Sequence, residues 1–216
     1  MPGSVEEKHV FVKVCGLGTV ADIDVSVAAG ADAVGLVISG TSVRGLDRDR
    51  AVRLAAHVPP GVVSVLVVND TAAADAARIA RELGVGALQL HGTAYHAEDF
   101  TAAAEIFPRL WRATSLSDRP DTRVGAYGEE VLLLDSPRAG SGEPWDLSLL
   151  EAARPEGAWL LAGGLSPHNV GEAIGRARPW GVDVSSGVES APGVKDHELV
   201  RAFVTAAKRA AAPQEA

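Results

Sequence analysis

The 216-residue sequence is poor in several features that mark common protein classes. It has 1 cysteine, so no disulfide bond can form within the chain and the fold does not require an oxidising compartment. No apolar run approaches the roughly 20 residues of a transmembrane helix, and residues 1–9 lack the apolar core of a signal peptide. We therefore expect a cytoplasmic protein that has no membrane partner.

Positive charge is also scarce. The chain has 20 Lys and Arg against 28 Asp and Glu, which gives a formal net charge of −8. Binding to a nucleic-acid backbone requires clustered Lys and Arg, so we expect no nucleic-acid partner. A small anionic ligand is compatible with this charge, because a few backbone amides and one cation can bind a phosphate group locally.

Apolar residues make up 47% of the chain, which is enough for a large core. Short runs rich in Val, Leu and Ala alternate with helical patterns, and this alternation indicates parallel strands joined by helices. We place eight strands near residues 10–15, 33–38, 62–68, 86–91, 109–114, 130–135, 158–162 and 180–184. Helices are expected over 19–29, from 47, from 69–71 to 83, over 96–106, from 146, from 166–167, and from 196 to about 210.

Eight such units predict a (β/α)8 TIM barrel that forms a single domain over residues 1–216, with flexible ends at 1–9 and 210–216. The connection 117–129 shows little helical periodicity, so we expect a short or missing fifth helix. An open doubly wound sheet is the competing architecture. It is disfavoured because Gly16-Leu17-Gly18 is followed by Ala21, where a nucleotide-binding turn has its third glycine.

Active sites of such barrels lie at the carboxyl ends of the strands. Cys15 ends the first strand beside a glycine turn, and is either a reactive thiol or a small buried one. Asp135 follows four apolar residues, and either caps the next turn or acts as an acid or base with a raised pKa. Arg44 follows the second strand, and is either a solvated surface residue or a fork for a substrate carboxylate.

Other strand ends also carry candidate binding residues. Gln89 and His91 share strand parity and should point inward, as substrate-binding groups or as an internal hydrogen-bond network. The loops with Gly163-Gly164 and Ser186-Gly187 follow the seventh and eighth strands, where barrels usually bind phosphate. The loop after the sixth strand is expected to fold over a ligand, with Gly142 as a binding residue.

Lys13 has the same strand parity as Cys15 and should also point into the barrel. Strands one and eight become neighbours when the barrel closes, so we predict a buried ion pair between Lys13 and Asp183. The cation would favour the thiolate form of Cys15.

Several stretches together resemble the phosphoribosylanthranilate isomerase family of tryptophan biosynthesis, and the resemblance covers nearly the whole chain. The matching stretches are Lys13-Val14-Cys15-Gly16-Leu17, 29–35, Ser42-Val43-Arg44, Leu88-Gln89-Leu90-His91-Gly92, 133–136, Gly140-Ser141-Gly142, Leu161-Ala162-Gly163-Gly164-Leu165 and 181–190.

The resemblance implies an Amadori rearrangement of a small phosphosugar, N-(5-phosphoribosyl)anthranilate, without a cofactor or a metal ion. It implies that Cys15 is the general base, Asp135 the general acid and Arg44 the partner of the anthranilate carboxylate. The glycine loops 163–164 and 186–187 would bind the phosphate group. We expect a monomer or a homodimer.

Two loops depart from the usual pattern of this family, at Gly45-Leu46-Asp47 and at Glu143-Pro144. They leave open a paralogue that acts on a modified substrate. A dual-substrate isomerase that also serves histidine synthesis is a further alternative, but such enzymes generally have a carboxylate where Cys15 stands. A non-catalytic phosphate-binding barrel is another alternative, and the presence of both Cys15 and Asp135 argues against it.

Overall fold

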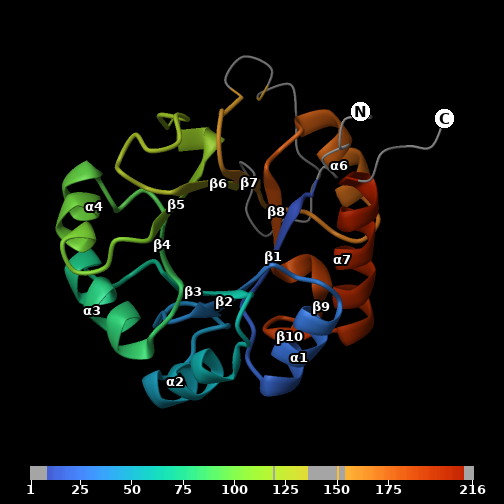
Figure 1. The fold of residues 1–216 in the computed structure, drawn as a ribbon, viewed down its shortest axis with the longest axis horizontal. Helices are drawn as coiled ribbons and strands as arrows, with labels where there is room; N and C mark the ends of the chain where they lie inside the picture. Colours follow the sequence, from blue (N-terminus) through green and yellow to red (C-terminus); the bar gives the residue numbers. More distant parts are fainter. Residues whose placement is uncertain (1–8, 119, 136–149, 151–153, 212–216) are drawn as a thin grey trace, which may run out of the picture.

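A computed structural model describes residues 9–118, 120–135, 150 and 154–211. Eight strands form a closed parallel barrel in which each strand pairs with the next and β8 pairs with β1 (Figure 1). The strands are β1 (Phe11–Cys15), β2 (Ala33–Val37), β3 (Val63–Val68), β4 (Ala87–His91), β5 (Leu110–Ser115), β6 (Val131–Asp135), β7 (Trp159–Leu161) and β8 (Gly181–Val184). The predicted barrel and its strand positions are confirmed.

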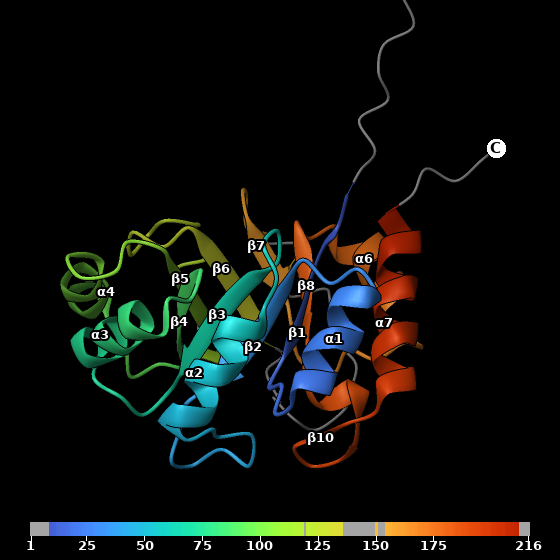
Figure 2. The same cartoon turned by 60° about the horizontal axis from the view of Figure 1, so that its bottom comes forward.

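The described helices pack on the outside of the barrel, and none of them lies outside β6 (Figures 1 and 2). They are α1 (Val20–Ala28), α2 (Arg48–His57), α3 (Ala73–Leu83), α4 (Ala97–Ala104), α6 (Val170–Ala177) and α7 (His197–Ala211). After β5 the described residues contain only the 3-10 turn η1 (Leu116–Asp118) before β6 begins, which confirms the helix-poor fifth connection. None of the helices in these described stretches is long and apolar enough to cross a lipid bilayer.

Strand alternation divides the core into two regions. Val12 and Val14 of β1 belong to the larger apolar cluster between strands and helices, whereas Cys15 belongs to the smaller cluster inside the barrel. Successive strand residues point to opposite faces. The inward set therefore includes Lys13, and the parity of β1 places the thiol at the carboxyl end of the barrel interior.

Local signals explain the helix ends. Thr19 and Asp22 form a reciprocal capping box at α1, and the Asp47 side chain accepts from the Arg50 amide at the start of α2. Gly84 ends α3 with φ 66°, a left-handed conformation that suits glycine. The expected N-cap types at 69–71 do not cap α3, since Ala72 holds that position without a side-chain bond.

Three expectations on the later helices need correction or lie outside the described residues. The helix expected from Ser166-Pro167 begins at Val170, because the Asn169 side chain bonds to the preceding loop. Residue 210 belongs to α7 rather than to a flexible tail. Of the helix predicted from residue 146, the structure describes only Leu150, which is helical and buried. Residues 1–8 and 212–216 lie outside the described residues, so the extent of the domain over 1–216 stays a prediction.

The sequence pattern did not predict a small hairpin after β8. The 3-10 turn η2 (Ser186–Val188) leads into β9 (Glu189–Ala191), which pairs antiparallel with β10 (Val194–Lys195). Pro192-Gly193 forms the connection, and such a dipeptide is a general turn signal. This hairpin lies beside the mouth of the barrel.

Candidate active site

A cavity of about 660 Å³ opens at the carboxyl ends of the strands. It contains every predicted site residue that the structure describes, namely Cys15, Arg44, Gln89, His91, Asp135, Gly163, Gly164, Ser186 and Gly187. The predicted Gly142 lies outside the described residues. These residues come from six different strand ends and loops, so the fold brings together groups that are far apart in the sequence.

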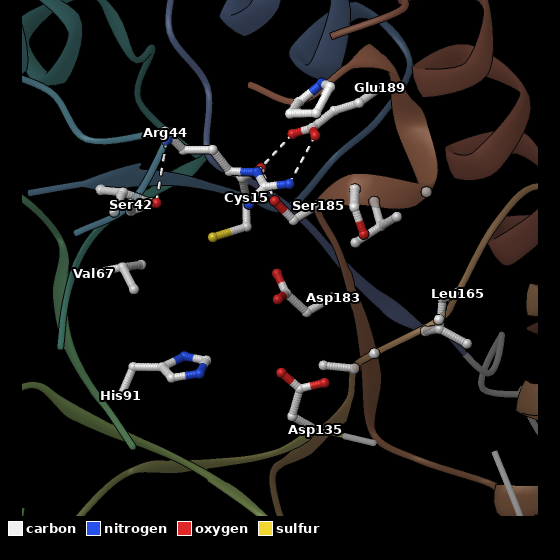
Figure 3. A pocket seen from close by; sticks show the side chains of 18 of the residues that line it. Cys15, Ser42, Arg44, Val67, His91, Asp135, Leu165, Asp183, Ser185 and Glu189 are labelled. Carbon is white, nitrogen blue, oxygen red and sulfur yellow. Dashed lines mark hydrogen bonds and ion pairs between the residues drawn. The ribbon is translucent and has the colours of Figure 1, made fainter. Parts of the chain in front are cut away.

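Cys15 and Asp135 both project into this cavity, from β1 and β6 (Figure 3). The carboxylate of Asp183 lies between them in this view. β1 and β6 are not neighbours in the barrel, so the thiol and the Asp135 carboxyl group approach a bound molecule from different sides. This arrangement suits an acid and a base that act on one small substrate.

The residue Cys15 is 8% exposed, and its thiol packs against Gly35 of β2. A Cβ atom at Gly35 would lie 2.6 Å from the Cys15 sulfur and 3.0 Å from its Cα atom, so only glycine leaves room for the thiol in this position. Burial raises the pKa of Cys15 above its ordinary value, although the Lys13 cation lowers it. The expectation that Lys13 favours the thiolate has the right direction, but burial outweighs it.

The predicted Lys13–Asp183 pair is confirmed. Lys13 Nζ donates to Asp183 Oδ1 at 2.8 Å, and the Lys13 side chain is 0% exposed. Burial alone would lower the pKa of Lys13, but the Asp183 carboxylate and Cys15 raise it above its ordinary value. A charged pair therefore lies directly beneath the thiol and beside the cavity.

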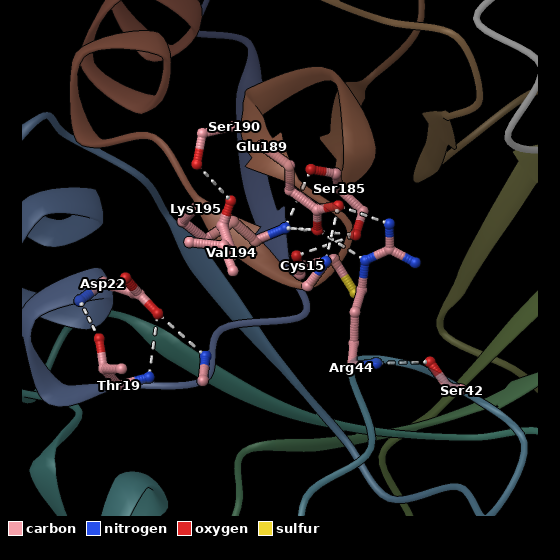
Figure 4. Close-up of polar contacts among 12 residues, drawn as sticks. Cys15, Thr19, Asp22, Ser42, Arg44, Ser185, Glu189, Ser190, Val194 and Lys195 are labelled. Atoms are coloured by element: carbon pink, nitrogen blue, oxygen red, sulfur yellow. Dashed lines mark hydrogen bonds and ion pairs between the residues drawn. The ribbon is translucent and has the colours of Figure 1, made fainter.

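Arg44 is not a solvated surface residue. Its Nε and Nη2 atoms each donate to a different carboxylate oxygen of Glu189 at 2.7 Å (Figures 3 and 4). Hydrogen bonding to Glu189 raises the pKa of Arg44. The stem of Arg44 occupies the space over Gly16, where a Cβ atom would lie 2.6 Å from Arg44 Cδ. Arg44 therefore forms a bidentate fork with a carboxylate of the same chain, and its binding of a substrate carboxylate stays a prediction.

Lys195 completes this cluster. Its Nζ atom donates to Glu189 Oε1 at 2.7 Å and to the Ser185 carbonyl at 2.9 Å. Burial alone would raise the pKa of Glu189, but hydrogen bonds from Arg44 and Lys195 hold that pKa below its ordinary value. Glu189 is therefore a carboxylate throughout the neutral range.

Gln89 and His91 form a polar pair on the wall of the cavity. Gln89 Nε2 lies 3.3 Å from His91 Nδ1, and burial and the Lys13 charge lower the pKa of His91, which is neutral at pH 7. Gln89 Oε1 is buried and has no hydrogen-bond partner within the described stretches. The Gln89–His91 contact fits an internal hydrogen-bond network. The Gln89 Oε1 acceptor, which has no partner among the described residues, fits a substrate-binding role, so both alternatives for this pair stay open.

The two glycine loops meet at one edge of the cavity. Gly163 and Gly164 have φ values of 83° and 65°, which are left-handed and favour glycine. A Cβ atom at Gly187 would lie 1.8 Å from the Leu165 carbonyl oxygen, so the loop after β8 can approach the loop after β7 only with glycine there. The Asn169 side chain fixes the first loop by donating to the Gly164 carbonyl at 2.8 Å.

Sequence reasoning missed several groups of the site. Ser42, Ser185 and Glu189 line the cavity, and Asp183 lines it in addition to pairing with Lys13. The Pro192-Gly193 turn was the available signal, because it indicates that the chain folds back after Glu189. In the parts of the chain that the structure describes, no group of three His, Cys, Asp or Glu side chains is arranged to hold a metal ion.

Comparison with known proteins gives consistent matches. The family model of N-(5'-phosphoribosyl)anthranilate (PRA) isomerase matches residues 12–206. A protein named N-(5'-phosphoribosyl)anthranilate isomerase from Haloferax volcanii is 40% identical over 207 residues, which cover 92% of this chain and 93% of that protein. One from Geobacter sp. is 40% identical over 204 residues, which cover 92% of this chain and 98% of that protein.

Solved structures of the same family also superpose on this chain. The crystal structure of TrpF from Jonesia denitrificans superposes with a TM-score of 0.89 at 53% identity, over 95% of this chain and 100% of that one. A phosphoribosylanthranilate isomerase in complex with reduced 1-(o-carboxyphenylamino)-1-deoxyribulose 5-phosphate superposes with a TM-score of 0.78 at 32% identity, over 93% of this chain and 99% of that one.

Proposed function

The chain belongs to the N-(5'-phosphoribosyl)anthranilate isomerase family, and from this premise we propose which of its residues carry out the reaction. The enzyme acts in tryptophan biosynthesis. It converts N-(5-phosphoribosyl)anthranilate to 1-(2-carboxyphenylamino)-1-deoxyribulose 5-phosphate. The observation that carries the residue assignment is the shared cavity into which Cys15 and Asp135 both project.

Asp135 is the general acid. The first step opens the ribose ring, and the ring oxygen must receive a proton as its bond to C1 breaks. Asp135 stands at the end of β6 and is half-buried at the cavity wall, so its carboxyl group can reach a sugar bound there. Ring opening leaves a Schiff base between C1 and the anthranilate nitrogen.

Cys15 is the general base. The Schiff base acidifies the C2–H bond, and the thiolate removes this proton to give an enol amine. The enol amine becomes the ketone product when C1 gains a proton and the C2 hydroxyl group loses one. The raised pKa of Cys15 means that the thiol predominates at neutral pH and that only the thiolate fraction reacts. A thiolate whose conjugate acid has a higher pKa is a stronger proton acceptor than a thiolate whose conjugate acid has a lower pKa.

The remaining groups bind the ends of the substrate. We assign the phosphate to the backbone amides of the 163–164 and 186–187 loops, which meet at one edge of the cavity. The anthranilate carboxylate is assigned to Arg44, and the apolar ring to the surface of Val37 and Val67 that lines the same cavity. We assign Gln89 and His91 to the sugar hydroxyl groups, because both residues line the same cavity.

Family membership also supports a proposal for the localisation and the oligomeric state of the enzyme. We propose that the enzyme works in the cytoplasm on a free phosphosugar, as a monomer or a homodimer. One related structure from Thermotoga maritima is described as a monomeric form generated from a dimeric isomerase, so both states occur in that protein.

One experiment tests the assignment of Asp135. Purified protein is mixed with freshly generated N-(5-phosphoribosyl)anthranilate, and the loss of substrate fluorescence is followed. Asp135→Asn should lower kcat by about 10²-fold or more, the scale for losing a general acid. Asp24→Asn is the matched control, because Asp24 lies on the outer helix α1 with its side chain 62% exposed. Near-normal turnover of Asp135→Asn would exclude it as the acid.

A further inference from the structure

The buried carboxylate of Glu189 has no place in the reaction steps above. Its side chain is 5% exposed and accepts from Arg44 Nε and Nη2 at 2.7 Å each, from Lys195 Nζ at 2.7 Å and from the Gly193 amide at 3.2 Å. Charge-assisted bonds of this length are strong, and a bidentate pair also fixes orientation. Glu189 is therefore tightly held at the mouth of the cavity.

Charge balance argues that a substrate carboxylate does not replace Glu189 on Arg44. Arg44 and Lys195 carry two positive charges and Glu189 carries one negative charge, so the cluster has a net charge of about +1. Displacing Arg44 would leave a nearly buried carboxylate with fewer donors, which is unfavourable. Binding one further carboxylate instead brings the cluster to neutrality.

The donors of Arg44 show where that carboxylate binds. A guanidinium group has five N–H donors, and Glu189 occupies the edge formed by Nε and Nη2. The edge formed by Nη1 and Nη2 offers a second fork of two parallel donors. In Figure 3, Glu189 lies on one side of Arg44, and Asp183, Asp135 and His91 lie on the other.

We infer that Glu189 is a positioning residue, which holds Arg44 so that its second N–H edge faces the cavity and receives the carboxylate of the aromatic substrate. This inference rests on the proposed function, since it assigns the group that orients Arg44 toward the anthranilate end. Glu189 acts through Arg44 and touches no reacting atom.

The cluster also fixes the distance between the carboxylate site and the base. Lys195 donates to the Ser185 carbonyl at 2.9 Å, and the Ser185 hydroxyl donates to the Cys15 carbonyl at 3.1 Å. Glu189 and Cys15 are thus joined by hydrogen bonds across the ends of β1 and β8 (Figure 4). A substrate held by Arg44 is placed in a fixed relation to the thiol.

A double-mutant cycle tests this role. We expect Glu189→Gln to raise KM about 10-fold while kcat changes little, the scale for losing a charge-assisted hydrogen bond. Arg44→Ala should raise KM at least as much, and the double variant should match Arg44→Ala alone. Glu130→Gln is the matched control. It weakens the exposed ion pair with Arg109, and Glu130 directly precedes β6 at the amino-terminal end of the barrel strands.

Two binding measurements separate positioning from a general structural effect. Inhibition by inorganic phosphate, which probes the glycine loops, should be unchanged in Glu189→Gln. Inhibition by the reduced product analogue, which carries the aromatic carboxylate, should weaken about 10-fold, as KM does. Thermal unfolding of each variant checks that it is folded under the assay conditions.

The inference is overturned if the KM effects of Glu189→Gln and Arg44→Ala multiply in the double variant. It is also overturned if phosphate inhibition weakens as much as inhibition by the product analogue. Failure of the proposed residue roles looks different, because Asp135→Asn or Cys15→Ser would then retain turnover whatever Glu189→Gln does to KM.

Discussion

Replacing Lys13 by methionine should destabilise the barrel strongly. The Lys13 side chain is 0% exposed, and its ammonium group lies 2.8 Å from Asp183 Oδ1, whose side chain is 10% exposed. Methionine fills a similar volume but leaves the Asp183 carboxylate without its cation. Removing one partner of a buried ion pair costs about 3–5 kcal/mol, because the remaining charge is buried without compensation.

That loss is large compared with the whole stability of a domain, which is typically about 5–15 kcal/mol. For a chain of this size, each kcal/mol corresponds to about 2–4 °C in Tm, so Lys13→Met should lower Tm by roughly 6–20 °C. The free energy of unfolding is measured by urea denaturation followed by circular dichroism, with Tm as the second readout.

The double variant Lys13→Met with Asp183→Leu is the decisive control. It removes both charges and should recover most of the loss, because an apolar pair of similar volume often replaces a buried ion pair without penalty. A loss below about 1 kcal/mol in Lys13→Met, the range of exposed pairs, would show that the Asp183 carboxylate does not need its buried cation. A double variant whose loss is the sum of both single losses would show the same.

Three further predictions concern the cavity. Gly35→Ala should lower kcat by about 10²-fold through displacement of the thiol, measured by steady-state kinetics, and an unchanged kcat would contradict the packing argument. Gly187→Ala must separate the two glycine loops, so inhibition by inorganic phosphate should weaken about 10-fold; equal inhibition would argue against that site. Because burial raises the pKa of Cys15, kcat/KM should still increase above about pH 8.5, the ordinary thiol pKa, and a plateau below it would contradict this.

The same shift of Cys15 affects stability. A thiol pKa that is higher in the folded state contributes stability that is fully present below the unfolded pKa and is lost as pH rises through the folded pKa. Wild type should therefore lose more unfolding free energy than Cys15→Ala between about pH 7 and about pH 10, in urea titrations at both values. Equal losses would show that the thiol titrates alike in both states.

The barrel itself could be predicted from sequence because its strands are buried on both faces and read as apolar runs. The parity of β1 and the closure of the barrel were enough to predict the contact between Lys13 and Asp183, 170 residues apart in sequence. The strand period and the order of strands in a closed barrel are sufficient for both predictions, and no loop contact is needed.

Contacts made by loops could not be predicted in this way. Arg44 and Glu189 are 145 residues apart and meet only because a hairpin folds back beside the barrel mouth. Similarly, Pro167 is a good first helical residue, but the bonds of Asn169 to the loop delay the start of α6 to Val170. Side-chain bonds to irregular backbone override the local helix signal at this point.

The proposed mechanism depends on removal of the C2 proton of the substrate by Cys15. Single-turnover kinetics of Cys15→Ser, with enzyme in excess over freshly generated N-(5-phosphoribosyl)anthranilate, measure this step. We predict that the chemical step slows by about 10²-fold or more, while the affinity for the reduced product analogue is unchanged. A Cys15→Ser variant that turns over its bound substrate at nearly the wild-type rate would exclude Cys15 as the general base.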